Sequence, residues 1–272
     1  MPEGHTIHRL AAEHRTRFGG RPVRAHSPQG RFADGARLID GQVLEHADAH
    51  GKHLLLYFAH DRVLHVHLGI YGKYAFGSLP APAPVGQVRL RLTGTGDDGD
   101  YADLRGPNTC ELLDTPQVKL LRDRLGPDPL RADADPDRAW RRISRSRAPI
   151  AQLLMDQSVI AGPGNIYRAE VLFRGNIHPD LPGRALSRSQ WQALWDDLVV
   201  LMKEGVRAGR IDTVRPEHTP EAMGRPPRVD DHGGEVYVYR RTGQPCLVCG
   251  AAVRARTLAG RNLFWCPTCQ PG

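Results

Sequence analysis

The chain has 272 residues, a length typical of two domains or slightly more, and 40% of them are hydrophobic, which excludes a disordered chain. Lysine and arginine number 37 against 30 acidic residues, and this net charge of +7 fits either a polyanionic partner or a generic basic surface. No stretch approaches the roughly 20 apolar residues that cross a bilayer, and no apolar signal core is visible, so we expect a cytoplasmic protein.

The N-terminal part is predicted to be a β-rich domain that begins with a helix. Residues 5–18 place apolar side chains near one helical face. Repeated short strands with glycine and proline between them are typical of a β-sandwich or barrel. The strand-like runs are residues 21–27, 41–50, 52–60, 62–68, 73–77, 86–94 and 100–106. A short helix within 115–130, stopped by a Gly-Pro pair, is expected next.

The C-terminal part is predicted to be helical after a linker rich in proline and charge at residues 126–137. We expect Asp135 to be the N-cap of the first helix and Pro149 to lie in the first turn of the second. The expected helices cover residues 135–146, 148–159, 164–176 and 187–209. Residues 211–235 are polar and proline-rich, which predicts a loop.

Four of the five cysteines follow the spacing C-x2-C-x16-C-x2-C, namely Cys246, Cys249, Cys266 and Cys269. Each C-x2-C pair can direct two thiolates at one ion, and the segment between the pairs suits a β-hairpin, so we predict a zinc ribbon. Two disulfides or a redox pair are the alternatives. Cys110 is expected to be a buried apolar thiol.

The stretch Gly162-Pro163-Gly164-Asn165 lies between two predicted helices. Two glycines allow the backbone to approach a ligand closely, and the N–H groups at the start of the next helix favour an anion. Asn165 is then either the N-cap or a phosphate contact. A tight turn between two helices, without a ligand, is the alternative.

Three segments, "MPEG", "DQSVIAGPGNIYRAEVLF" and "GRNLFWCPTCQ", together resemble the formamidopyrimidine-DNA glycosylase / endonuclease VIII family of bacterial base-excision repair enzymes, most closely its actinobacterial endonuclease VIII branch. The resemblance implies a multi-domain α+β fold. A β-sandwich flanked by helices would cover residues 1–125, a helical domain with a helix–two-turn–helix motif residues 126–235, and a zinc finger with one structural Zn²⁺ residues 236–272.

The resemblance also implies a bifunctional DNA glycosylase/AP lyase that excises oxidised bases, preferably pyrimidines, and cuts the strand by β,δ-elimination. Loss of Met1 would leave Pro2 with a secondary amine, and because an α-amino group has a pKa of about 7.7–8.0, far below that of lysine, a usable fraction can be neutral and nucleophilic near pH 7. Glu3 would be the general acid/base. Thr6 stands where the family has a second glutamate, and His5 or His8 could replace it. A frayed terminus is the alternative.

The same resemblance assigns the DNA contacts. Lys52, Asn165 and Arg261 would bind phosphates, with Lys52 and Arg261 counted alongside the catalytic Pro2 and Glu3. Ile70 and Tyr71, which follow Gly69, would fill the space left by the flipped base, or would instead pack inside the sandwich. The expected partner is damaged double-stranded DNA, bound by a monomer without a membrane, in a bacterial cytoplasm and at the nucleoid when on DNA.

Two other functions remain open at this point. An oxidised-purine glycosylase, acting on 8-oxoguanine or formamidopyrimidines, is the alternative within the same family, although the "MPEG" start and Tyr71 favour the endonuclease VIII branch. A catalytically silent protein that binds damaged DNA would need only the helical domain and the zinc ribbon, and the presence of Pro2, Glu3 and Lys52 disfavours it.

Overall fold

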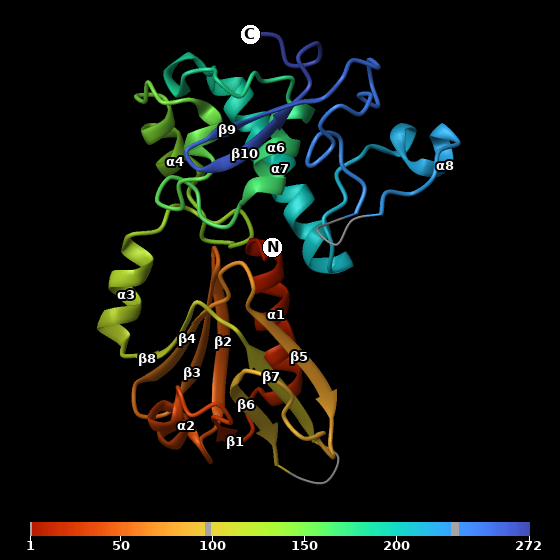
Figure 1. The fold of residues 1–272 in the computed structure, drawn as a ribbon. Helices are drawn as coiled ribbons and strands as arrows, with labels where there is room; N and C mark the ends of the chain where they lie inside the picture. Colours follow the sequence, from red (N-terminus) through yellow and green to blue (C-terminus); the bar gives the residue numbers. More distant parts are fainter. Residues whose placement is uncertain (1, 96–98, 230–233) are drawn as a thin grey trace. The chain divides into compact units, whose positions relative to one another are not determined.

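The structure, a computed structural model, describes residues 2–95, 99–229 and 234–272. The chain divides into two compact units, Met1–Arg124 and Leu125–Gly272 (Figure 1). None of the helices in the described ranges is long and apolar enough to cross a bilayer.

Unit 1 contains two four-stranded antiparallel sheets. The first has the order β1 (Val23–His26), β6 (Val88–Gly94), β7 (Asp100–Arg105) and β5 (Lys73–Ser78). The second has the order β2 (Leu44–His50), β3 (His53–Phe58), β4 (Arg62–His67) and β8 (Thr109–Leu113). Three helices accompany them: α1 (Gly4–Phe18), α2 (Ala33–Ile39) and α3 (Thr115–Asp123).

A single core joins the two sheets and explains why these strands form. In β6 every second side chain is buried, as the alternation of "VRLRLTG" requires for a strand with one face in a core. Leu90 and Leu92 from this strand share one apolar cluster with Leu54 and Leu56 of β3 and with Ile7 of α1. The two sheets therefore form a β-sandwich, and α1 packs against β2 and β3. On the opposite face of β3 and β4, α3 covers a smaller cluster.

Unit 2 is helical and ends in a hairpin. Its helices are α4 (Pro136–Ile143), α5 (Ile150–Leu153), α6 (Asn165–Arg174), α7 (Arg188–Ala208) and α8 (Pro220–Met223), with 3₁₀ turns η1 (Gly183–Ala185) and η2 (Pro216–His218). The hairpin consists of β9 (Arg254–Leu258) and β10 (Arg261–Trp265). Helices and hairpin share one core, so this unit folds around a single apolar cluster.

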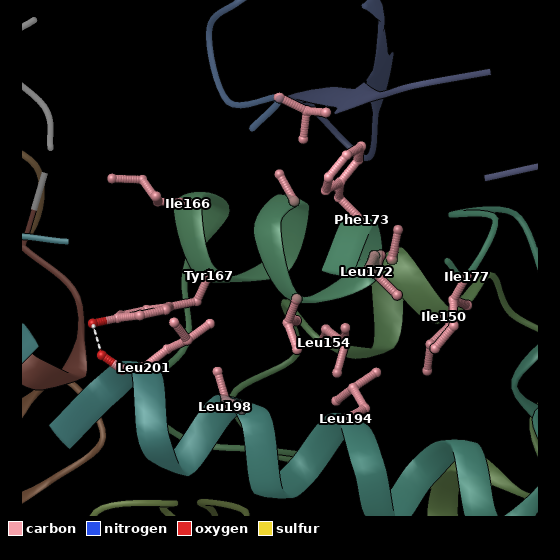
Figure 2. Packing of buried hydrophobic residues seen from close by; sticks show 14 of the residues in the cluster. Ile150, Leu154, Ile166, Tyr167, Leu172, Phe173, Ile177, Leu194, Leu198 and Leu201 are labelled. Atoms are coloured by element: carbon pink, nitrogen blue, oxygen red, sulfur yellow. Dashed lines mark hydrogen bonds between the residues drawn. The ribbon is translucent and has the colours of Figure 1, made fainter. Parts of the chain in front are cut away.

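The centre of unit 2 is the contact between α6 and α7 (Figure 2). Tyr167 and Phe173 of α6 are both buried; Tyr167 points toward Leu198 of α7, whereas Phe173 points away from α7 and stacks on Tyr237. The ends of α7 agree with its sequence: Ser187 forms a capping box with Gln190 at the start, and Gly209 adopts a left-handed conformation at the end. The apolar pattern and these caps fix a long helix that supports α6.

Four details differ from the sequence-based expectations. Gly164, not Asn165, is the N-cap of α6, because Asn165 already has helical geometry. The helix expected over 148–159 is only Ile150–Leu153. Two elements, α2 and β8, were not expected. The segment 211–235 contains η2 and α8 as well as loop, and its residues 230–233 lie outside the described residues.

Candidate active site and DNA-binding residues

The predicted catalytic residues of unit 1 lie at one end of the sandwich. His53 pairs with His67 in the register of β3 and β4, so the β2–β3 turn and the loop after β4 meet at the same edge. The N-terminus of α1 reaches this edge too. Gly19, which follows the last residue of α1, forms a β-bridge with Leu44 at the other end of β2. A 15-residue helix and a seven-residue strand are both roughly 22 Å long, so the start of α1 is level with the far end of β2. Figure 1 shows the N-terminus beside the end of β2.

Glu3 is placed where a buried carboxyl group can act beside residue 2. It is fully buried, has an extended backbone at the N-cap of α1, and accepts the Thr6 N–H through its carbonyl at 3.0 Å. Within the described part of the chain its side chain makes no capping hydrogen bond to the helix. Capping of the helix therefore does not explain why a carboxylate is buried at this position. Pro2 is half-buried, and Met1 lies outside the described residues.

His5 is not a charged substitute for the missing glutamate. Burial lowers the pKa of His5 to about 4, so the ring is neutral at pH 7. Its Nε2 lies 3.2 Å from the Thr6 hydroxyl. The His5–Thr6 pair can therefore pass or accept a hydrogen bond near Glu3, but it adds no charge there.

Lys52 lies in the β2–β3 turn, after Gly51, whose φ of 59° is readily adopted by glycine. Behind the turn lies a row of histidines that the sequence reasoning did not single out. His53 Nδ1 is 2.8 Å from His65 Nε2, and His65 Nδ1 is 2.9 Å from Glu111 Oε1. The sequence signal for this row of histidines was the spacing of His65 and His67, two residues apart in β4, whose strand partner β3 begins with His53.

Burial keeps this histidine row neutral. It lowers the pKa of His53 to about 3 and also lowers the pKa values of His65 and His67. The His53 ring stacks on His65 with centroids 5.1 Å apart. Lys52 lies near the neutral His67 and can offer a positive charge to a phosphate at this edge.

Ile70 and Tyr71 are exposed at the tip of the loop after β4, with 58% and 86% of their surfaces accessible. The loop is tight, because Gly72 N–H donates to Leu68 O at 3.0 Å. Gly69 has a φ of 67°, and a Cβ there would lie 2.9 Å from Asn108 Cβ. Neither Ile70 nor Tyr71 packs inside the sandwich, so that alternative is wrong.

In unit 2 the structure brings Asn165 and the segment containing Arg261 together. Arg261 is exposed at the start of β10, directly after the two-residue turn Ala259–Gly260, whose residues both have positive φ. The Asn165 side-chain Nδ2 donates to Asn262 O at 2.9 Å. The turn before α6 and the tip of the hairpin are thus hydrogen-bonded to each other.

The four spaced cysteines form one cluster whose sulfur atoms all lie within 4.8 Å of one another. Cys246 and Cys269 are 3.8 Å apart, and Cys249 and Cys266 are 3.5 Å apart. Zn–S bonds of about 2.3 Å in a tetrahedron require sulfurs about 3.8 Å apart, so the set fits one zinc ion and not two disulfides. Cys110 is separate, and burial raises the pKa of its thiol to about 12.

Three family models match this chain in order along its length. Residues 1–110 match the formamidopyrimidine-DNA glycosylase N-terminal domain, residues 125–215 its H2TH domain, and residues 243–272 the zinc finger found in FPG and IleRS. The chain belongs to the formamidopyrimidine-DNA glycosylase / endonuclease VIII family. Members of this family are DNA glycosylases with AP lyase activity, so the predicted enzyme class, α+β fold and zinc ion are confirmed.

Relatives within the family fall into two groups. "Endonuclease 8 1" of Mycobacterium tuberculosis and of Mycobacterium bovis are 53% identical over 274 aligned positions, covering 99% of this chain and all of theirs. "Formamidopyrimidine-DNA glycosylase" of Streptococcus pneumoniae is 34% identical, covering 86% of this chain and 84% of its own. A solved complex of wild-type Lactococcus lactis Fpg with DNA containing an oxidised pyrimidine has a TM-score of 0.79 at 26% identity, with full coverage of both chains.

Proposed function

We propose that this glycosylase excises oxidised pyrimidines from damaged double-stranded DNA as a monomer, using Pro2 as nucleophile, and cuts the strand by β,δ-elimination. The observation that carries the pyrimidine preference is the 53% identity, over 99% of this chain, to proteins named endonuclease 8. The exposed Ile70 and Tyr71 agree with it, because an apolar and an aromatic side chain suit the space that a flipped base leaves.

The proposed chemistry starts from the Pro2 nitrogen after Met1 has been removed. Its lone pair forms a bond to C1′ of the damaged nucleotide while the glycosidic bond breaks and the base leaves with its electron pair and a proton. The buried Glu3 carboxyl protonates the sugar ring oxygen, so the ring opens and an iminium remains. The iminium acidifies C2′, so loss of the C2′ proton to a base gives an enamine that expels the 3′ phosphate. Loss of the C4′ proton then allows the 5′ phosphate to leave, and water finally hydrolyses the iminium and releases the amine.

Phosphate contacts hold the strand during these steps. Lys52 provides the charge next to the neutral histidine row, and Asn165 and Arg261 provide donors from the H2TH turn and the zinc hairpin. Such contacts fix position without reading sequence, so the loss of any one of them weakens binding to all DNA sequences alike.

A second candidate is the excision of oxidised purines. The 34% identity to the pneumococcal formamidopyrimidine-DNA glycosylase and the fold match to Lactococcus Fpg favour it. Both candidates use the chemistry proposed for Pro2 and Glu3, so the identity of the released base separates them.

Single-turnover base release from duplexes with thymine glycol or 8-oxoguanine distinguishes the two candidates. We expect release of thymine glycol to be faster by about tenfold or more, a difference within the usual range for pocket discrimination. Faster release of 8-oxoguanine would establish the purine alternative. Tight binding without release of either base would indicate a silent binder. Undamaged duplex of the same sequence is the control.

A further inference from the structure

We propose that Arg168 is a positioning residue that joins the H2TH turn and the zinc hairpin into a single phosphate clamp. This inference rests on the proposed function, because it assumes that Asn165 and Arg261 contact DNA. Arg168 lies on α6, one turn after Asn165, and its residue is only 1% exposed. It therefore acts on DNA through its neighbours.

One guanidinium nitrogen of Arg168 bonds to both elements. Its Nη2 donates to Asn165 Oδ1 and, at 2.8 Å, to the backbone carbonyl of Asn262 on β10. That same carbonyl accepts the Asn165 Nδ2 bond. Arg168, Asn165 and Asn262 thus form a closed triangle in which Asn262 lies 94 and 97 positions from the other two residues.

The triangle determines which way the Asn165 amide faces. An amide oxygen directed at a phosphate would be repelled, whereas its NH₂ group would be attracted. Because the charged Arg168 holds the oxygen, the two N–H donors are directed away from it. One donor goes to Asn262, and the second is then the group that binds phosphate.

The triangle also fixes the hairpin next to Arg261. Asn262 follows Arg261 directly, so holding its carbonyl holds the start of β10. Cys266, a predicted zinc ligand, follows the other end of this strand. β10 is thus fixed at one end by the metal site and at the other by Arg168 and Asn165. Burying a guanidinium is costly unless it is hydrogen-bonded, and here its bonds go to the two DNA-contacting elements.

A double-mutant cycle tests this role. Zinc-loaded protein with Arg168→Met, Arg261→Ala or both is titrated against a duplex that carries a tetrahydrofuran abasic analogue, at two salt concentrations. We expect Arg168→Met to weaken binding by about tenfold in the native background and by a clearly smaller factor in the Arg261→Ala background, where only its effect through Asn165 remains. The salt dependence should fall more in the native background than in the Arg261→Ala background.

Two controls separate a positioning role from a loss of folding. Arg168→Lys keeps a charged donor and should recover part of the affinity. Arg174→Lys alters another arginine of α6, which bonds to Asp197 of α7 and not to the hairpin, and it should leave the affinity unchanged. Zinc content and tryptophan fluorescence report folding of every variant.

The outcomes are distinct. Equal losses in both backgrounds would overturn the positioning role, as would an Arg168→Met variant that binds like the native protein. If Arg261→Ala alone did not weaken binding, the assumed phosphate contact of Arg261 would be wrong, and the proposed function would need revision first.

Discussion

Glu3 combines two properties that a general acid needs: a carboxyl group, and burial directly beside the predicted nucleophile. General acid catalysis typically contributes about 10²- to 10⁴-fold. Opening of the sugar ring needs this help when a base is still attached. An abasic site is already partly open, so its cleavage depends less on the acid.

The first prediction concerns Glu3→Gln. We expect release of an oxidised base to fall by about 10²-fold or more, and cleavage of a preformed abasic site to fall by a clearly smaller factor. Single-turnover assays on the two substrates measure both. Equal losses on both would mean that Glu3 does not act at ring opening.

His14 shows how burial of a neutral histidine links stability to pH. It is fully buried, its Nδ1 donates to Leu10 O at 2.7 Å, and its ring lies 4.8 Å from Tyr74. Burial lowers its pKa to about 4, against about 6.5 in the unfolded chain. Between these two pH values the unfolded chain binds a proton that the folded chain does not. Stability therefore falls as the pH drops from 6.5 to 4.

The second prediction is that His14→Phe weakens this acid sensitivity. The free energy of unfolding of unit 1 should depend less steeply on pH than in the native protein. The slope should be smaller by up to about 1.4 kcal/mol per pH unit, because the unfolded chain of the variant no longer takes up this proton. Urea unfolding at pH 7.5 and 5.0, followed by far-UV circular dichroism, measures it. All four tryptophans lie in unit 2, so their fluorescence follows that unit separately.

The control is His26→Gln, which replaces an exposed histidine of β1. In this variant the free energy of unfolding should differ between pH 7.5 and pH 5.0 by the same amount as in the native protein. If the free energy of unfolding of His14→Phe changed between pH 7.5 and 5.0 as much as that of the native protein, His14 would take up its proton in the folded as well as in the unfolded chain, which contradicts the prediction.

Residue-level predictions from the sequence succeeded where the spacing itself carries the chemistry. The cysteine spacing alone indicated the metal site, whereas the roles of Pro2 and Glu3 came from the family resemblance and stay predictions. Arg168 could not be found in this way. In the sequence it is one basic residue of a helix, and its burial depends on a hairpin 94 residues later.

Among the elements, α6 connects most of unit 2. Near its start Asn165 and Arg168 bond to the hairpin, and in its second half Glu170 holds the segment before the zinc site. Glu170 is fully buried and accepts the N–H groups of Tyr237, Val238 and Tyr239 at 2.7, 2.9 and 2.9 Å. It also accepts the Thr213 hydroxyl at 2.6 Å.

The third prediction is that Glu170→Gln destabilises unit 2. The glutamine NH₂ would face donors that now bond to a carboxylate oxygen, which leaves buried N–H groups without acceptors. We expect a loss of about 2–4 kcal/mol in the free energy of unfolding, measured by tryptophan fluorescence in urea. Glu204→Gln on α7, whose partner Arg207 forms an exposed ion pair, should cost about 0.5 kcal/mol or less. A Glu170→Gln variant as stable as this control would contradict the role.

The long elements could be predicted from the sequence and the short ones could not. α1 and α7 have an apolar face over several turns, so their existence and approximate bounds were confirmed. α2 has seven residues, one of them Gly35, and β8 has no regular burial pattern, so neither carries a periodic signal. α5 is short because the chain turns after Leu154 to reach the Gly162–Gly164 turn.

For the whole molecule, the net charge of +7 becomes informative once the family is known. A basic chain that belongs to a DNA glycosylase family gains affinity by releasing counterions from phosphates, so binding should weaken steeply with salt. The proposed chemistry, in contrast, depends on the nitrogen of residue 2. Affinity and catalysis can therefore be lost independently.

Borohydride trapping on abasic DNA tests the central claim most directly. The protein with Met1 removed should form a covalent complex whose cross-link maps to Pro2 by mass spectrometry. A protein extended by a few residues before Pro2 should bind the same DNA and give almost no trapped complex. Equal trapping by the extended protein, or a cross-link at Lys52, would contradict the proposed mechanism.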